Sequence, residues 1–376
     1  MWSLHHTITF RFRNRSHSSL QTPDADGLYN APMKETPDTN DAIVSTGVRS
    51  VIGGFLMGLA NLVPGISGGT MLLASGVYPQ FISAVSDITT FRWRLRSLII
   101  IACIGISAVV AIALLAGVVT GLIISHQWIM YSIFIGLTLG GVPIILRLLR
   151  PISTKAMIAA AIGCACMIIL AMAEMLGAEG ASENLSGHTA LLFAGGVTAG
   201  AAMVLPGVSG SYLLLILGQY LLIFDAVNDA KLGLKNADTE AMMAAAKILL
   251  PAVVGAVIGI VVVSNVLKRL LERAPQITLG ALMGLLIGAV VGLWPFQARI
   301  EPQIGDTTAW GQVITNEQQL AELEPKNWAT EFFSPSPGLI IGALCLIGIG
   351  FAISMAIGWA GTVLDQQSKR SAAINE

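Results

Sequence analysis

Charged side chains are scarce in this sequence. Asp, Glu, Lys and Arg make up 11% of its 376 residues, whereas soluble domains carry about a quarter. Hydrophobic residues make up 54%, and the mean hydropathy is +0.75. This balance excludes a soluble globular domain. It predicts an all-α polytopic membrane protein, because a helix satisfies its own backbone hydrogen bonds in lipid.

Motifs for metal binding and for hydrolytic chemistry are also absent. The cysteines form no CxxC pair, and the apolar segments contain no HxxxH or DxxD pattern. His126 and His188 fall in predicted loops. We therefore predict a protein that is not an enzyme, with no catalytic residue, metal or cofactor. The four cysteines lie inside apolar runs, and we interpret them as small core residues: Cys103, Cys164, Cys166 and Cys345.

The first 46 residues lack a continuous apolar core, which excludes a secretory signal peptide. They carry Arg11, Arg13 and Arg15 without a nearby acidic residue, and we predict a disordered tail. The stretch resembles an organellar transit peptide, and it also fits sequence translated from a start codon placed too early. The second interpretation is favoured because Met33 begins an ordinary polar leader, "MKETPDTNDA".

Apolar segments, in contrast, are abundant. A window of about 19 residues finds six continuous ones, at about 97–124, 128–149, 155–176, 248–268, 276–295 and 338–363. Two further segments, 48–86 and 190–227, are longer than one span of about 20 residues needs, and proline and glycine interrupt them. We expect unbroken spans at the first set and broken helices at these two.

The two broken segments are related in sequence at an offset of 142. "GGFLMGLANLVPGISGGTMLLASGVY" (53–78) matches "GGVTAGAAMVLPGVSGSYLLLILGQY" (195–220), including both Pro-Gly pairs. Such an internal match indicates a tandem duplication. We expect the same offset to relate 97–124 to 239–266 and 128–149 to 270–291.

The duplication defines the predicted domain organisation. Repeat 1 is expected at 47–177 and repeat 2 at 188–364. A polar insertion at 296–337 precedes the last helix of repeat 2, and residues 365–376 are expected to form a cytoplasmic tail.

Basic loops predict how each repeat faces, because loops rich in Lys and Arg stay in the cytoplasm. If each broken segment is a re-entrant hairpin, each repeat has three full spans and the second copy is inverted. Arg49, both termini and the basic loops then share one side, while Glu174, Glu179, Glu183 and the insertion share the other. The basic loops hold Arg92, Arg94 and Arg96, Arg147, Arg150 and Lys155, and Lys268, Arg269 and Arg273.

The predicted fold is therefore two inverted repeats, each a Pro/Gly-broken re-entrant helical hairpin followed by three transmembrane helices. If each broken segment were a pair of full spans instead of a hairpin, every loop would stay on the same side of the membrane. However, each half of a broken segment has only about 15 to 20 residues, which is short for a span.

Unwound backbone at membrane depth is costly unless protein or a wet cavity covers it. After each Pro-Gly pair we expect a helix to restart at Ser67 and at Ser209, which are good N-cap residues. We expect the N–H groups of Gly68, Gly69 and Thr70 to be free and to point toward the break, and such groups at a helix start bind phosphate or carboxylate. The predicted substrate-binding residues are Pro64, Gly65, Ser67, Gly68, Gly69 and Thr70, with Pro206, Gly207, Ser209, Gly210, Ser211 and Tyr212.

No Lys or Arg lies within either motif, which favours a translocation site that must release its ligand. Two alternatives stay open. The Pro and Gly residues can kink the helices for packing alone, and carbonyl groups at the first half-helix ends can bind a cation.

The paired motifs "PGISGGT…GVY" and "PGVSGSY…GQY" resemble those of the bacterial polyprenyl-phosphate transporter family over residues 47 to 366. The resemblance implies a multi-pass protein of the bacterial cytoplasmic (inner) membrane. It implies that the protein returns undecaprenyl phosphate, a lipid carrier of envelope glycans, from the outer to the cytoplasmic leaflet. The sequence departs from an exact repeat where Ser211-Tyr212 replaces Gly69-Thr70.

This interpretation makes a polyprenyl-phosphate lipid the partner, with no nucleic acid and with a homo-oligomer left open. Arg49, Arg96 and Arg147 are candidate headgroup-receiving residues, although any single arginine fits topology anchoring better. Glu174 is a candidate for proton coupling, for which an interfacial cap is the favoured interpretation. The alternative function is an inorganic anion or phosphate channel or secondary transporter.

Overall fold

The computed structural model describes residues 40–63, 65–175, 188–306, 308, 313–323 and 328–374. They belong to one compact unit, Asp38–Glu376. Most of the predicted N-terminal tail and Pro64 lie outside the described residues. The tail boundary at 46 is corrected, because the first helix already begins at Asn40. Buried Thr46 in this helix accepts a hydrogen bond of 3.3 Å from Arg96.

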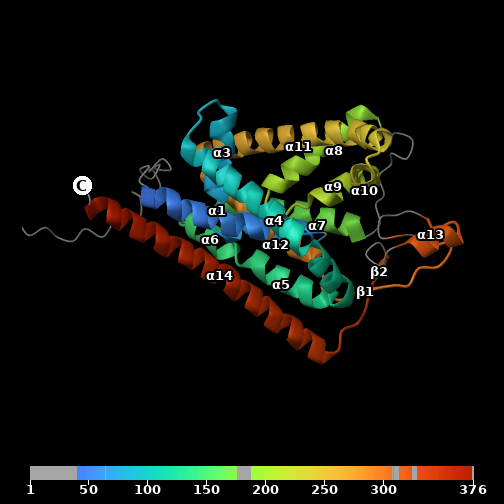
Figure 1. Ribbon diagram of the computed structural model, residues 1–376. Helices are drawn as coiled ribbons and strands as arrows, with labels where there is room; N and C mark the ends of the chain where they lie inside the picture. The colour runs from blue at the N-terminus through green and yellow to red at the C-terminus, as the bar shows by residue number, and fades with distance from the viewer. Residues whose placement is uncertain are drawn as a thin grey trace, which may run out of the picture. The chain divides into compact units, whose positions relative to one another are not determined.

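The helices and strands run along the two halves of the chain in the following order (Figure 1). The first half contains α1 (Asn40–Asn61), α2 (Gly68–Ala74), α3 (Tyr78–Thr89), α4 (Leu95–Ser125), α5 (Gln127–Leu139), α6 (Val142–Leu148) and α7 (Thr154–Met175). The second half contains α8 (Thr189–Val204), α9 (Gly210–Ile216), α10 (Tyr220–Asn236), α11 (Thr239–Arg273), α12 (Pro275–Gly292), β1 (Gln297–Arg299), α13 (Glu317–Glu322), β2 (Thr330–Phe332) and α14 (Pro337–Ile374).

The predicted spans are confirmed. Among the described residues, 6 helical segments are long and apolar enough to cross a membrane. They are Leu95–Ser125, Gln127–Leu148, Thr154–Ala173, Thr239–Arg273, Pro275–Gly292 and Pro337–Trp359. Large apolar side chains on them face outward, among them Leu114 and Leu250, as expected of helices in lipid. The chain is a mostly helical, multi-pass membrane protein.

Two boundaries of the predicted fold need correction. The fold is not strictly all-α, since β1 and β2 in the insertion form an antiparallel pair with Gln297 opposite Phe332. Water can solvate the open edges of such a pair outside the bilayer. The expected C-terminal tail at 365–376 is not a separate element either, because α14 continues to Ile374.

The two broken segments break where the Pro-Gly pairs predicted. α1 ends at Asn61 and α2 starts at Gly68, while α8 ends at Val204 and α9 starts at Gly210. Gly65 and Gly207 have φ values of 83° and 89°, a region that L side chains rarely adopt. A second turn follows each short helix, and α9 and α10 meet at 114°.

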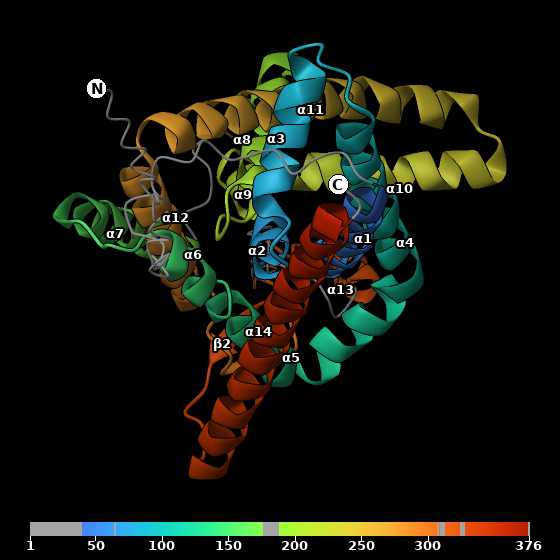
Figure 2. The same cartoon turned by 90° about the vertical axis from the view of Figure 1, so that its left-hand side faces the viewer.

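Four helix pairs frame the breaks: α1 with α4, α8 with α11, α7 with α12, and α5 with α14. Figures 1 and 2 both show α7 beside α12 and α5 beside α14. Glycine permits the close approach, as in other membrane helix pairs. A Cβ on Gly284 of α12 would overlap the carbonyl of Ala160 on α7, and one on Gly136 of α5 would overlap that of Ile347 on α14.

These matching contacts correct the expected offset of the later helices. Gly136 and Gly284 each lie against a carbonyl of the paired helix, and they are 148 positions apart. The residues that carry these carbonyls, Ile347 and Ala160, are 187 positions apart. The offset of 142 therefore holds through the broken segments. An offset of 148 relates α4 to α11, and it also relates α5 and α6 together to α12. An offset of 187 relates α7 to α14. The first shift follows from α10, which has 17 residues against 12 in α3, and the second from the insertion.

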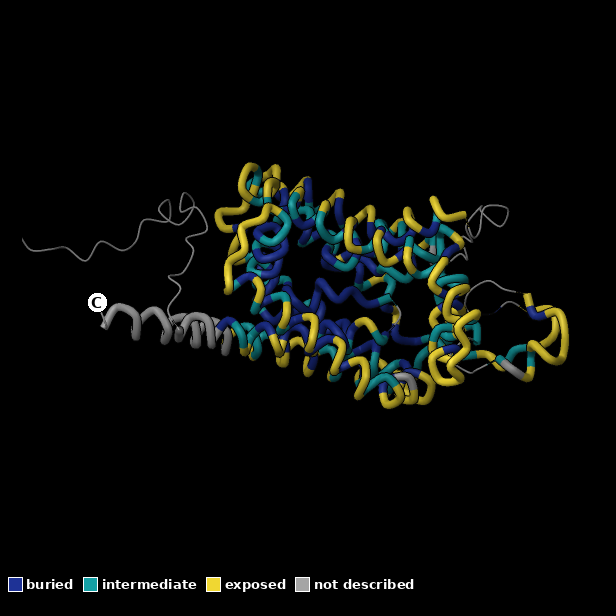
Figure 3. The backbone as a smooth tube through the Cα atoms, turned by 45° about the horizontal axis from the view of Figure 1, so that its top comes forward, coloured by how far each residue is buried: buried dark blue, intermediate teal, exposed yellow. Residues whose placement is uncertain are grey.

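Buried residues gather in the middle of the described part of the chain, as the dark blue tube in Figure 3 shows. One cluster of buried apolar residues joins α2, α3 and α4 to α11 and α12, and it includes Leu72, Ile82, Ile104, Leu267 and Leu286. Both halves of the chain therefore contribute to one core.

We predict that glycine is required at the α5–α14 contact. Gly350→Val places atoms against the Ile133 carbonyl, whereas Gly348, two residues away on α14, has nothing within 4 Å of a built Cβ. Overpacking costs roughly 1–3 kcal/mol. Thermal unfolding in detergent should show a clearly lower Tm for Gly350→Val than for the control Gly348→Val. Equal Tm values for the two variants would contradict the contact.

Candidate functional site

The two breaks lie against each other, and hydroxyls of the first broken segment pair with backbone groups of the second. The Ser67 hydroxyl donates to the Leu205 carbonyl at 2.9 Å, and the Gly207 N–H donates to Thr70 Oγ1 at 2.9 Å. The Tyr78 hydroxyl donates to the Val204 carbonyl at 3.0 Å. Unwound backbone of the second break is thereby paired inside the protein, as backbone at membrane depth must be.

The predicted N-cap positions are confirmed, but their side chains do not cap. Ser67 and Ser209 precede α2 and α9 with extended backbone, and neither side chain bonds a helix N–H. Ser67 Oγ is engaged with the other break, and Ser209 Oγ lies 3.0 Å from Ser211 Oγ. The expectation of a free N–H at Thr70 is wrong, because that group donates to the Ser67 carbonyl at 3.2 Å.

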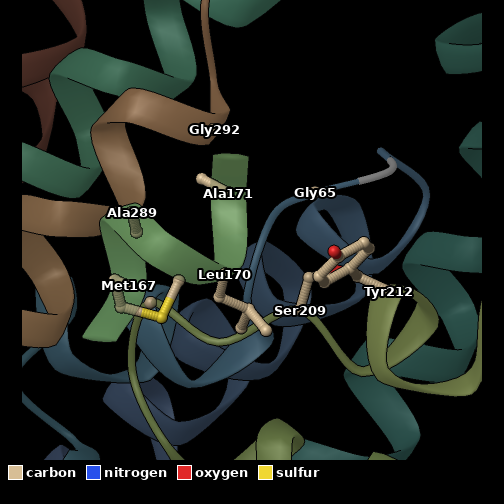
Figure 4. A pocket seen from close by; sticks show the side chains of 9 residues that line it. Gly65, Met167, Leu170, Ala171, Ser209, Tyr212, Ala289 and Gly292 are labelled. Carbon is tan, nitrogen blue, oxygen red and sulfur yellow. The ribbon is translucent and has the colours of Figure 1, made fainter. Parts of the chain in front are cut away.

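A small pocket opens between the breaks and the α7–α12 pair (Figure 4). The space between atoms there is about 280 Å³, a volume that includes open solvent. Its lining is Gly65 from the first break, Gly207, Ser209 and Tyr212 from the second, Met167, Leu170 and Ala171 from α7, and Ala289 and Gly292 from α12. Two hydroxyls and backbone are the polar groups that the described lining residues bring, and none of these residues is Lys, Arg, Asp, Glu or His.

The pocket contains only some of the predicted site residues. Gly65, Gly207, Ser209 and Tyr212 line it, whereas the others that the structure describes do not: Ser67, Gly68, Gly69, Thr70, Pro206, Gly210 and Ser211. Sequence reasoning missed the contribution of α7 and α12. The pocket residues on these two helices are small or apolar residues within apolar helices, so nothing in the sequence pattern distinguishes them from their neighbours.

Three of the motif glycines have a packing role instead. A Cβ on Gly68 would lie 2.9 Å from Met57 Cγ, one on Gly69 would lie 2.9 Å from the Val204 carbonyl, and one on Gly210 would lie 3.1 Å from the Ala199 carbonyl. Substitution at these glycines therefore tests packing as well as ligand approach.

Comparison with known protein sequences identifies the family. Residues 57–309 match the undecaprenyl phosphate translocase-like family. The chain belongs to this family. The resemblance inferred from the paired Pro-Gly motifs is thus confirmed.

Two curated relatives carry the name polyprenyl-phosphate transporter. The protein from Staphylococcus aureus (strain NCTC 8325 / PS 47) is 30% identical over 187 residues, which cover 48% of this chain and 65% of the relative. The protein from Vibrio cholerae serotype O1 (strain ATCC 39315 / El Tor Inaba N16961) is 28% identical over 197 residues, 48% of this chain and 60% of the relative. The chain therefore spans less than two thirds of each relative. No solved structure matches the chain.

The predicted headgroup-receiving arginines lie away from the pocket. Arg49 donates to the Gly76 carbonyl at 2.8 Å and so holds the turn between α2 and α3. Arg96 donates to Thr46, and Arg147 is exposed on α6. The side chain of Glu174 lies outside the described residues.

A buried carboxylate that the sequence analysis did not single out joins α3 to α11. Asp87 is 9% exposed, accepts a hydrogen bond of 2.9 Å from the Ser97 hydroxyl, and lies 3.5 Å from Lys268 Nζ. One signal could have found it, because "AVSD" at 84–87 recurs as "AVND" at 226–229 at the offset of 142.

Burial of the two broken segments is unequal although their sequences match. Every residue of α2 is buried, whereas Tyr212 is the buried residue of α9. α3 packs against both α4 and α11. The short helix α2 is thus enclosed by the protein, whereas α9 contributes Tyr212 to the pocket.

We predict that the two N-cap serines are not equivalent. Ser67→Ala removes the hydroxyl that donates to the partly buried Leu205 carbonyl, which then keeps a longer bond of 3.5 Å from the Val208 N–H. This loss should lower the free energy of unfolding by about 1 kcal/mol. Ser209→Ala removes only a contact with Ser211 and should lower it less. Thermal unfolding of the two variants in one detergent compares them directly, and a larger loss for Ser209→Ala would contradict the observed bonding.

Proposed function

We propose that this protein is a flippase that returns undecaprenyl or another polyprenyl phosphate from the outer to the cytoplasmic leaflet of a bacterial inner membrane. The lipid would then be available again for synthesis of envelope glycans. The observation that carries the proposal is the pocket built from both Pro-Gly breaks. The names of the two relatives support the substrate class, and the proposal assigns no enzymatic step.

The pocket's chemistry suits a lipid phosphate that must be bound and released. Moving a phosphate charge through hydrocarbon is prohibitive, whereas a polyprenyl chain is at home there. The Ser209 and Tyr212 hydroxyls offer donors to the headgroup, and Met167 and Leu170 offer an apolar wall to the start of the chain. Without a fixed cation in the lining, the headgroup is not held too tightly to leave.

The proposal includes the inverted, re-entrant arrangement of the two repeats. In Figure 1 the start of α1, the α3–α4 turn and the end of α14 lie at the left, which we assign to the cytoplasm. The α10–α11 turn, β1, β2 and α13 lie at the right, which we assign to the outside. Each hairpin would then leave the membrane on the side it entered.

With this orientation the pocket belongs to the outer half of the membrane. Its residues 167–171 and 289–292 lie toward the C-terminal ends of α7 and α12, which face the insertion. On the cytoplasmic side α3 closes against α11 through Asp87 and Lys268. The structure would thus represent a state open to the outer leaflet. A homo-oligomer stays open.

We predict that filling the pocket stops transport. Ala171→Phe projects a ring among the pocket residues, whereas Met172→Phe, one residue away, changes a side chain that is 51% exposed toward lipid. In liposomes with leaflet-selective labelling of polyprenyl phosphate, Ala171→Phe should lose most of the flipping rate, and Met172→Phe should keep it.

The control for this experiment is equal insertion and Tm of both variants. Native flipping by a well-folded Ala171→Phe protein would show that the headgroup passes elsewhere. Competition by inorganic phosphate, together with uptake of labelled phosphate, would instead favour the alternative anion carrier.

We also predict the topology. In a background without native cysteines, Arg94→Cys should react with an impermeant thiol reagent only from the cytoplasmic side, and Gln303→Cys only from outside. Labelling in spheroplasts and in inverted vesicles measures both. Reaction of the Arg94→Cys variant from outside would contradict the inverted-repeat arrangement. The transport of polyprenyl phosphate is tested separately, by the liposome experiment.

A further inference from the structure

A hydroxyl on α14 is fully buried and has no hydrogen-bond partner among the described residues. Ser354 is 0% exposed, and its Oγ bonds to no other group in the part of the chain that the structure describes. A serine inside a helix usually donates to the carbonyl four residues earlier, and burying an unpaired hydroxyl is costly. The group therefore calls for an explanation beyond packing.

The repeat relation connects Ser354 with the pocket. A Cβ built on Gly288 meets the Cβ of Met167, and one built on Gly140 meets the Cβ of Ser354 in the same way. This agrees with the offsets of 148 and 187 between these helices. Ser354 thus occupies in repeat 2 the place that Met167, a pocket residue, occupies in repeat 1.

The region around Ser354 is closed, whereas the region around Met167 is open. Gly358, the equivalent of pocket residue Ala171, lies against α2, with 3.7 Å from a built Cβ to the Ala74 carbonyl. Gly141, the equivalent of Ala289, lies against Leu73 of α2, with 3.3 Å from a built Cβ to Leu73 Cδ2. The repeat equivalent of the open pocket is therefore occupied by α2.

The equivalents of the two pocket hydroxyls are engaged as well. Ser67 corresponds to Ser209, and Thr70 corresponds to Tyr212. Ser67 and Thr70 bind the Leu205 carbonyl and the Gly207 N–H of the second break. If those two bonds and the packing of α2 were released together, Ser67, Thr70 and Ser354 would face one space.

We propose that Ser354 is a headgroup-binding residue of a second, cytoplasm-facing pocket, in which it acts with Ser67 and Thr70. The proposal rests on the proposed transport function and assigns the group that receives the phosphate on the far side of the membrane. Ser354 is unpaired here because its ligand binds in the other state. Because Ser354 carries a hydroxyl where Met167 carries a thioether in the other repeat, the second pocket is the more polar of the two.

The first test compares two buried serines that have no partner among the described residues. Ser264 on α11 is also 0% exposed and unpaired, but its repeat equivalent, Ala116, does not line the pocket. A hydrogen bond to a charged group is strong enough to change a rate by roughly tenfold to hundredfold. Ser354→Ala should slow polyprenyl-phosphate flipping in liposomes by about that factor, with an unchanged or higher Tm, while Ser264→Ala flips at the native rate.

Each outcome of that comparison decides something. Native flipping by Ser354→Ala, or equal slowing by both variants, overturns the role of Ser354 while leaving the transport function in place. A native protein that moves no polyprenyl phosphate overturns the proposed function itself, and the inference falls with it.

A second test does not depend on measuring transport. In a background lacking the four native cysteines, Ser354→Cys should react with an impermeant thiol reagent added to the cytoplasmic face of inverted vesicles, and polyprenyl phosphate should slow that reaction. Met167→Cys should react from the outer face. Labelling of the Ser354→Cys variant from outside, or its resistance from both faces, overturns the second pocket.

Discussion

The fold depends on one constraint, which is that backbone polar groups inside a membrane must find partners within the protein. Each Pro-Gly break leaves such groups unpaired, and a break is tolerated only where something else bonds to it. In this protein the first broken segment bonds to the backbone of the second, through the hydroxyls of Ser67, Thr70 and Tyr78. The backbone of the second break therefore depends on the first broken segment for its partners.

Four glycine-rich helix pairs hold the breaks in place. Lipid offers helices no hydrophobic drive to associate, so their association must come from close backbone approach and van der Waals contact. The pairs α7–α12 and α5–α14 exchange helices between the two halves of the chain, which links the repeats into one core. A rigid frame of this kind permits a small pocket beside the breaks without collapse of the surrounding helices.

Two nearly identical sequence elements take up different environments in this frame. α2 is enclosed and α9 borders the pocket, so the molecule has an internal asymmetry that its sequence symmetry does not require. For a transporter this is the expected form of one end state, because a site exposed equally to both sides would leak. The exchange of environments between α2 and α9 is the motion that the proposed function needs.

The sequence by itself determined the membrane class, the six spans, the duplication and the positions of both breaks, because composition, hydropathy and Pro-Gly chemistry act locally. It also identified the family from the paired motifs around Ser67 and Ser209. Only the tertiary structure decided which hydroxyls cross between the breaks, that Met167 and Ala289 line the pocket, that Gly68 packs against Met57, and that the register shifts after α10. Those features depend on which helix faces meet, and an apolar helix that is hydrophobic on all sides carries no signal of its contact face. Ser354 is the clearest case, since one serine in an apolar span acquires meaning only from the residue that stands in its place in the other repeat.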